Sequence, residues 1–491
     1  MAMTVVETRY GKVRGIRGNN RGNTVFRGIP YAKAPVGELR FAPPAECEKW
    51  EGVRDCTDFA PTCMQMTGTF GLFGREFYPE PKNISEDCLY LNVWTPAEKA
   101  GEKRPVFFFI HGGAYLGGYS YEQEFDGEAM NLRGCILVTI EYRCNAFGFF
   151  AHPELTKKNG RSGSAGMEDQ LMALKWVYEN IEAFGGDPEN ITVHGQSAGA
   201  MSTRTLLASP RAKGMVNRVI IQSGGGINDW SSFRSMSEQE QMGEEMLKDL
   251  GWSFEDVMTK SAEEVYERLN QASMRFGGPG GLLTFHPCID DFNLFESPGE
   301  SIKKGEINTD SIMCGSVAGD FRLNSVVDDD DPEFAAKAKA GGCISQVALG
   351  EYNAAHGYKP IYGYFFDRAL PGDNEGSWHS CEMWYMFGSL CRCWRPWKAY
   401  DYALSDLMVD YWCNFARTGD PNSEEGAPEK RSGETRPLWP AYTEKTPCIL
   451  VFGDSDGPVE DGIQAKKLIE DPAVSRNIDK YMKSGMAEKL S

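Results

Sequence analysis

Residues 191–209 read ITVHGQSAGAMSTRTLLAS, the most informative stretch of the chain. Its first part is a short apolar run typical of a buried strand, and its second part holds small and apolar residues suited to a helix. Between them lies a G-x-S-x-G pattern, Gly195 to Gly199, whose small residues allow a tight strand-to-helix turn. We therefore predict that Ser197 is a nucleophile, raised above the edge of a sheet at the N-terminus of a helix.

Apolar runs of strand length occur on both sides of this stretch. LYLNVW, PVFFFI and CILVTIEY precede it, and RVIIQSG, SIMCGSV and PIYGYFFD follow it. Continuous apolar runs rich in β-branched residues favour strands buried on both faces of a largely parallel sheet. Helix-like segments alternate with them, such as Gly166 to Phe184 and Ala399 to Arg417. The sequence predicts an α/β fold with a central, mostly parallel sheet flanked by helices.

The length of 491 residues would allow about three domains at roughly 150 residues each. No linker or internal repeat divides the chain, however, so we predict one domain over residues 1–491. Residues 231–283 are helix-like and polar without a strand run, and we interpret them as a helical insertion or cap within that domain.

The G-x-S-x-G pattern occurs a second time, at Gly453 to Gly457. Ser455 is flanked by aspartates and followed by proline, and none of the 6 histidines lies downstream of it. The order serine, acid, histidine could not be completed after Ser455. We predict a turn there and keep Ser197 as the nucleophile.

Chain order leaves two histidines as candidates for the base. His356 precedes the strand run PIYGYFFD, where a structural or exposed histidine is the ordinary interpretation. His379 lies in a loop after that run, where the order of elements places a catalytic base.

The carboxylate that orients the base should follow an intervening strand, and Asp320 after SIMCGSVAG meets this condition. The run 328–331 favours a solvated acidic loop, and Glu382 is too close to His379 in sequence to be the first choice. A nearby glutamate remains the open alternative to Asp320.

The run PVFFFI leads into the glycine-rich turn HGGAYLGG. Backbone N–H groups there can approach a substrate without obstruction by side chains. We predict an oxyanion hole formed by the N–H groups of Gly113, Ala114 and Ala198, each typically worth about 3–4 kcal/mol in the transition state. The turn lacks the Lys-Ser/Thr of a phosphate loop. Acyl transfer by these groups calls for no metal or organic cofactor. Cys391 and Cys393 form the tightest cysteine pair, but no further ligands follow them at zinc-site spacing.

The composition narrows the class of partner. Asp and Glu number 70 against 51 Lys and Arg, a net charge of -19, which disfavours nucleic acids and anionic membranes. No apolar run approaches the roughly 18 residues of a membrane span, and the N-terminus lacks a secretory signal. The 14 cysteines are scattered, which favours reduced thiols. We expect a cytoplasmic monomer or small homo-oligomer with a small-molecule partner.

With these residues in place, the chain resembles the type B carboxylesterases, the branch of the α/β-hydrolases that includes the cholinesterases and the bacterial para-nitrobenzyl esterases. The motifs that carry the likeness run nearly end to end: FRGIPYAKAPVGELRFAPP, SEDCLYLNVWTP, DQLMALKWVYENIEAFGGDPENITVHGQSAGA, IIQSGG, YWCNFARTGDPN and LWPAY. The resemblance implies an α/β-hydrolase fold. It implies the same roles for Ser197, for His379 and for the oxyanion hole of Gly113, Ala114 and Ala198.

Some positions depart from the family. The family acid is usually a glutamate, where this chain has Asp320, and many members have Glu before the nucleophile, where this chain has Gln196. Tyr78 stands where cholinesterases place a choline-binding tryptophan, which argues against choline esters. Cys63 and Cys88 stand where secreted relatives form a disulfide, and we expect them to lie close together and reduced.

The sequence thus predicts a serine carboxylesterase that hydrolyses uncharged carboxylic esters through an acyl-enzyme on Ser197. Aromatic residues make up 12% of the chain, and those near the motif loops favour an apolar gorge with Tyr78 and Trp378 as substrate contacts. An amidase, a thioesterase or a lactonase on the same triad remains an alternative, as does a non-catalytic binding protein on the same fold.

Overall fold

The computed structural model describes residues 3–20, 22–66, 74, 76–77, 81, 83–229, 232–277, 282–320, 332–423, 425–427, 436–472, 474–475, 478 and 481; for 332–342 it describes the backbone only. No helix among these residues is both long enough and apolar enough to cross a membrane.

Eleven strands of the described chain form one sheet, in the order β14-β13-β12-β11-β10-β9-β7-β8-β6-β4-β3. From β8 to β13 all neighbours are parallel, and antiparallel pairs occur only towards the two edges. The strands of this sheet are β3 (Ile16–Arg17), β4 (Thr24–Pro30), β6 (Tyr90–Thr95), β7 (Arg104–Ile110), β8 (Ile136–Ile140), β9 (Gly186–Gln196), β10 (Arg218–Gln222), β11 (Ile312–Val317), β12 (Tyr362–Phe366), β13 (Ile449–Phe452) and β14 (Ile463–Lys466). A small second sheet joins β1 (Val5–Glu7), β2 (Lys12–Arg14) and β5 (Val53–Asp55).

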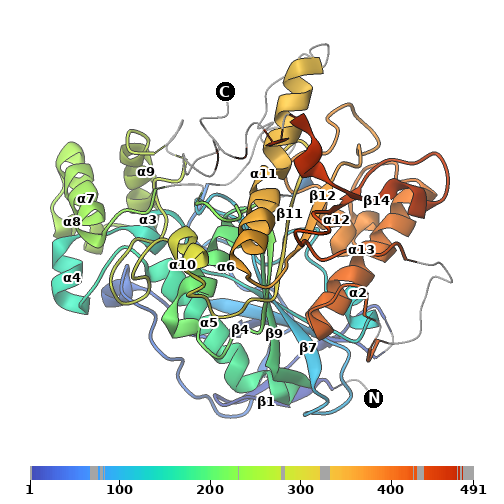
Figure 1. Cartoon of the computed structure of the whole chain (residues 1–491). Helices are drawn as coiled ribbons and strands as arrows, with labels where there is room; N and C mark the ends of the chain where they lie inside the picture. The colour runs from blue at the N-terminus through green and yellow to red at the C-terminus, as the bar shows by residue number, and fades with distance from the viewer. Residues whose placement is uncertain are drawn as a thin grey trace.

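Helices cover both faces of the large sheet (Figure 1). On one face α5 (Ala165–Asn180), α6 (Ala198–Ala208) and α11 (Pro332–His356) contact the strands, and on the other α2 (Glu128–Leu132) and α13 (Ala399–Thr418) do, with α12 (Met383–Met386) packed on α13. Further α-helices of the described chain are α3 (Asn145–Phe149), α4 (Pro153–Asn159), α7 (Met236–Leu250), α8 (Phe254–Thr259), α9 (Ala262–Ser273) and α10 (Pro298–Lys304). Short 3-10 helices span Gly37–Leu39, Ile181–Phe184, Pro210–Ala212, Leu390–Arg392, Val459–Gly462 and Leu468–Glu470.

Strand β7 shows why its residues are apolar without interruption. Val106, Phe108 and Ile110 belong to the hydrophobic core on the α5 and α6 face, whereas Phe107 and Phe109 belong to the core on the α13 face. Because successive side chains of a strand point to opposite faces, a strand between two cores needs an apolar residue at every position.

The structure confirms the central, mostly parallel sheet flanked by helices that the sequence predicts. The expected strands correspond to β6 through β12, and the expected helices correspond to α5 and α13. Among its described residues the stretch 231–283 holds α7, α8 and α9, which begin after the capping serines Ser235, Ser253 and Ser261.

Candidate active site

Ser197 occupies a strained turn between β9 and α6. Its φ of 56° and ψ of -125° lie outside the regions that non-glycine residues ordinarily adopt. A Cβ on Gly195 would lie 2.2 Å from the Gly199 carbonyl oxygen, and a Cβ on Gly199 would lie 2.0 Å from the Ile110 carbonyl oxygen. Both positions of the motif therefore require glycine, because the chain folds back on itself and on β7.

Backbone hydrogen bonds hold this turn from both sides. The Ser197 N–H donates to the carbonyl of Gln222 at the end of β10 (2.9 Å), and the Ser197 carbonyl accepts from Ala200 and Met201 in α6. Such turns persist only where the surroundings determine them fully. The strain at Ser197 is thus balanced by the neighbouring strand and the helix.

His379 and Asp320 come together from two loops. Asp320 follows β11, His379 follows β12, and the Gly319 N–H donates to the Ser377 carbonyl (2.7 Å), which joins the two loops. The Asp320 carboxylate, in a residue only 6% exposed, accepts a hydrogen bond from His379 Nδ1. Burial lowers the pKa of His379, but the charge and hydrogen bond of Asp320, with the charge of Glu382, outweigh it, so the pKa is raised.

The other ring nitrogen of His379 points towards the nucleophile turn. His379 Nε2 lies 3.2 Å from the side-chain nitrogen of Gln196, the residue directly before Ser197. Strand β9 and the His379 loop therefore meet at the serine. The sequence singled out Gln196 as a departure from the family, but no signal in it indicated this contact.

Glu382, three residues after His379, is fully buried in a polar network. Its carboxylate accepts from the Gln222 amide (3.1 Å) and the Tyr364 hydroxyl (3.2 Å), and Gln222 also contacts His194. Burial, with the charge of Asp320 adding to it, raises the pKa of Glu382 to about 7. Burial lowers the pKa of His194 to about 3, so this histidine is neutral.

The glycine-rich turn after β7 lies against the serine. A Cβ on Gly112 would be 3.1 Å from the Ser197 Cβ, and the backbone φ is positive at both Gly113 (101°) and Ala114 (56°). The N–H groups of Gly113 and Ala114 donate to no acceptor among the described residues. The N–H of Ala198, at the start of α6, has no partner within its helix. The turn thus places backbone N–H donors beside Ser197.

The sequence offers four further candidates, Ser455, His356, Trp378 and Tyr78. The Ser455 hydroxyl accepts from the Gly457 N–H (3.0 Å) in a surface bend, and His356 ends α11 with its ring stacked on Tyr352. Trp378 is 3% exposed and packs against Phe77, so its role as a substrate contact stays a prediction. Tyr78 lies outside the described residues.

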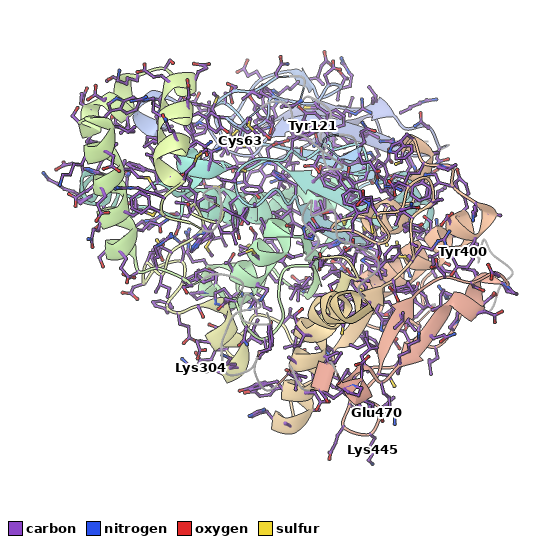
Figure 2. The ribbon with its side chains drawn as sticks, turned by 90° about the horizontal axis from the view of Figure 1, so that it is seen from above. Cys63, Tyr121, Lys304, Tyr400, Lys445 and Glu470 are labelled. Carbon is purple, nitrogen blue, oxygen red and sulfur yellow. The ribbon has the colours of Figure 1, made fainter. Side chains whose placement is uncertain are left out.

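The cysteines form no metal site and no disulfide in the described chain. Every one of the 14 is a free thiol, and no described group of three or more His, Cys, Asp or Glu side chains could hold a metal ion. Cys63 and Cys88 are both buried, and burial, with a smaller contribution from Cys63, raises the pKa of the Cys88 thiol. Figure 2 shows Cys63 within the body of the molecule and Lys445 at its periphery.

Comparison with known proteins finds a family and several esterases that this chain is similar to. A family model described as the carboxylesterase family matches residues 2–341 and 339–468. The chain is 32% identical over 508 residues to the para-nitrobenzyl esterase of Bacillus subtilis (strain 168), a match that covers 95% of this chain and 98% of that protein. It is 40% identical over 323 residues to the fumonisin B1 esterase of Sphingopyxis macrogoltabida, covering 65% of this chain and 56% of that protein.

Solved structures give the same result. A thermophilic PNB esterase superposes with a TM-score of 0.79 at 29% sequence identity, covering 97% of this chain and 99% of that one. A carboxylesterase from Geobacillus stearothermophilus superposes with a TM-score of 0.72 at 32% identity, covering 96% and 98%.

Proposed function

Because this chain belongs to the carboxylesterase family, and is a serine carboxylesterase with the α/β-hydrolase fold, we propose that Ser197, His379 and Asp320 are its catalytic triad. The observation that carries this assignment is the pair of contacts made by the His379 ring. Its Nδ1 donates a hydrogen bond to Asp320, and its Nε2 lies beside Gln196, the residue before Ser197. Asp320 fixes the tautomer in which Nε2 can accept the proton of the serine.

The proposed reaction begins when Ser197 Oγ attacks the ester carbonyl carbon and its proton moves to His379 Nε2. The carbonyl oxygen becomes an oxyanion, which the N–H groups of Gly113, Ala114 and Ala198 stabilise. The imidazolium then protonates the leaving alcohol, which departs as the carbon–oxygen bond breaks and the acyl-enzyme forms. Water attacks the acyl-enzyme with His379 again as base, releasing the acid and restoring Ser197.

The proposed substrates are esters whose acyl and alcohol parts are uncharged. Gln196 supports this choice, because it places a neutral amide beside His379 where a glutamate would place a charge. We further propose a reducing compartment, which the scatter of the 14 cysteines along the chain supports.

Labelling with a fluorophosphonate, followed by peptide mass mapping, tests the nucleophile. We expect one adduct, on the peptide that carries Ser197, and its loss in Ser197→Ala. The matched control is Ser455→Ala, which changes the serine of the second G-x-S-x-G pattern and should label like the wild type. Turnover of a short-chain aryl ester should fall by about 10⁴-fold or more in Ser197→Ala. An adduct on Ser455, or no adduct at all, contradicts the assignment.

A further inference from the structure

Gln196 is held between the candidate base and the glycine-rich turn. The residue is 5% exposed, its side-chain nitrogen lies 3.2 Å from His379 Nε2, and a Cβ on Gly112 would lie 3.0 Å from its side-chain oxygen. The carboxamide thus directs its nitrogen at the imidazole and its oxygen at the turn. It occupies the side of His379 opposite Asp320.

The protonation state of His379 determines what Gln196 can do there. When Nδ1 carries the hydrogen that Asp320 accepts, Nε2 has a single lone pair, which accepts a hydrogen bond from the Gln196 amide until the Ser197 hydroxyl takes that place in the reaction. When the imidazole becomes an imidazolium, Nε2 carries a hydrogen and needs an acceptor. An amide can meet either state by turning its oxygen or its nitrogen to the ring, whereas a carboxylate can only accept and stabilises the imidazolium alone.

Among the residues that the structure describes, the charged groups that act on His379 are Asp320 and Glu382, and neither lies on the Gln196 side of the ring. Asp320 approaches from the loop after β11, and Glu382 approaches from the residue before α12. On the β9 side the described neighbours Gln196 and Ser197 are uncharged, as is Gln222 at the end of β10. A third carboxylate at position 196 would add to two acids that already favour the imidazolium.

We propose that Gln196 is a positioning residue that orients the neutral imidazole of His379 and keeps a carboxylate away from its proton-accepting nitrogen. The proposal rests on the triad assigned above. The neutral amide keeps the base unprotonated at a lower pH than a glutamate in the same place would. The enzyme thereby extends its activity towards acidic conditions.

An NMR titration of the imidazoles tests this directly, without relying on turnover. The chain has only 6 histidines, so enzyme labelled with ¹³C at histidine Cε1 gives few signals, and His379→Asn identifies the one from His379. In Gln196→Glu we expect the pKa of His379 to rise by about one unit or more, because an opposite charge within about 4–6 Å favours the charged ring. The acidic limb of the profile of kcat/KM against pH should move to higher pH by the same amount. At pH values below that limb, kcat/KM should therefore be about tenfold lower than in the wild type.

Two further variants make the outcome decisive. Gln271→Glu adds the same charge at an exposed position on α9 and should leave the His379 titration unchanged. Gln196→Met keeps the length of the side chain but removes the amide, and we expect kcat to fall about tenfold with KM little changed. The inference is overturned if Gln196→Glu leaves the His379 pKa unmoved, or, should that variant not fold, if Gln196→Met keeps the wild-type kcat. Fluorophosphonate labelling of wild-type Ser197 decides the triad separately.

Discussion

Asp320 reaches the imidazole with a side chain one methylene shorter than that of a glutamate. The join between the loops, through the Gly319 N–H and the Ser377 carbonyl, brings Asp320 close enough for its carboxylate to contact His379 Nδ1 directly. The shorter acid is thus matched by the position of its loop.

Replacing this carboxylate should separate the two candidate acids. We expect Asp320→Asn to lower kcat by about 10⁴-fold, because the amide can donate to Nδ1 and favour the wrong tautomer. Glu382→Gln should cost much less, since Glu382 contacts Gln222 and Tyr364 and not the ring nitrogens. Turnover of an aryl ester measures both variants. If Glu382→Gln lost activity while Asp320→Asn kept it, the acid would be Glu382.

The G-x-S-x-G motif predicts Ser197 from the sequence, and chain order predicts His379 and Asp320 because each follows a strand of the sheet, with a nearby glutamate left open as the acid. The contact of Gln196 with His379 joins residues 183 positions apart, and its existence depends on the direction of a side chain in a strained turn. The pKa of Glu382 depends on complete burial, which no local pattern records. Pairwise geometry of this kind follows only from the fold.

Among the elements, the two G-x-S-x-G patterns differ in how much space surrounds their first glycine. A Cβ on Gly195 would meet the Gly199 carbonyl oxygen at 2.2 Å, whereas the nearest atom to a Cβ on Gly453 would be 3.5 Å away. We expect Gly195→Ala to lower the free energy of unfolding by about 2–3 kcal/mol or more, because rigid backbone must move. Gly453→Ala should change it by less than about 1 kcal/mol. Urea unfolding followed by circular dichroism measures both, and equal losses would contradict this account of the turn.

Most central elements could be predicted from their composition, as the uninterrupted apolar residues of β7 illustrate. Helix α11 could not, because Gly341 and Gly342 stand inside it and glycine disfavours helix interiors by about 1 kcal/mol each. Contacts with β11 and β12 stabilise this helix instead. Strand β13 has only four residues, Ile449–Phe452, and short apolar runs do not distinguish a strand from a helix segment.

At the scale of the whole molecule, buried acids link stability to pH. Burial raises the pKa of Glu122 to about 8 and of Glu141 to about 7, and burial with the charge of Glu122 raises the pKa of Glu124. These folded-state values lie above the ordinary glutamate value of 4.5, so folding takes up protons. The stability from these groups is therefore fully present at low pH and is lost as the pH rises from about 4.5 towards 8.

Glu124→Gln should weaken this dependence. The amide cannot ionise. The free energy of unfolding of the variant, minus that of the wild type, should therefore increase as the pH rises from 5 to 8, by up to about 1.4 kcal/mol per pH unit. Urea unfolding at several pH values measures the difference. Glu267→Gln, on the exposed side of α9, is the control and should follow the wild type. A constant offset between Glu124→Gln and the wild type would contradict the linkage.

The order in which β9, β11 and β12 leave the ribosome has a consequence for biosynthesis. The loop with Ser197 is made first, Asp320 follows, and His379 is made only after β12. On the proposed triad, a nascent or truncated chain that ends before residue 379 thus carries Ser197 without the base that would activate it. Turnover is acquired late, once the strands that hold the loops have paired.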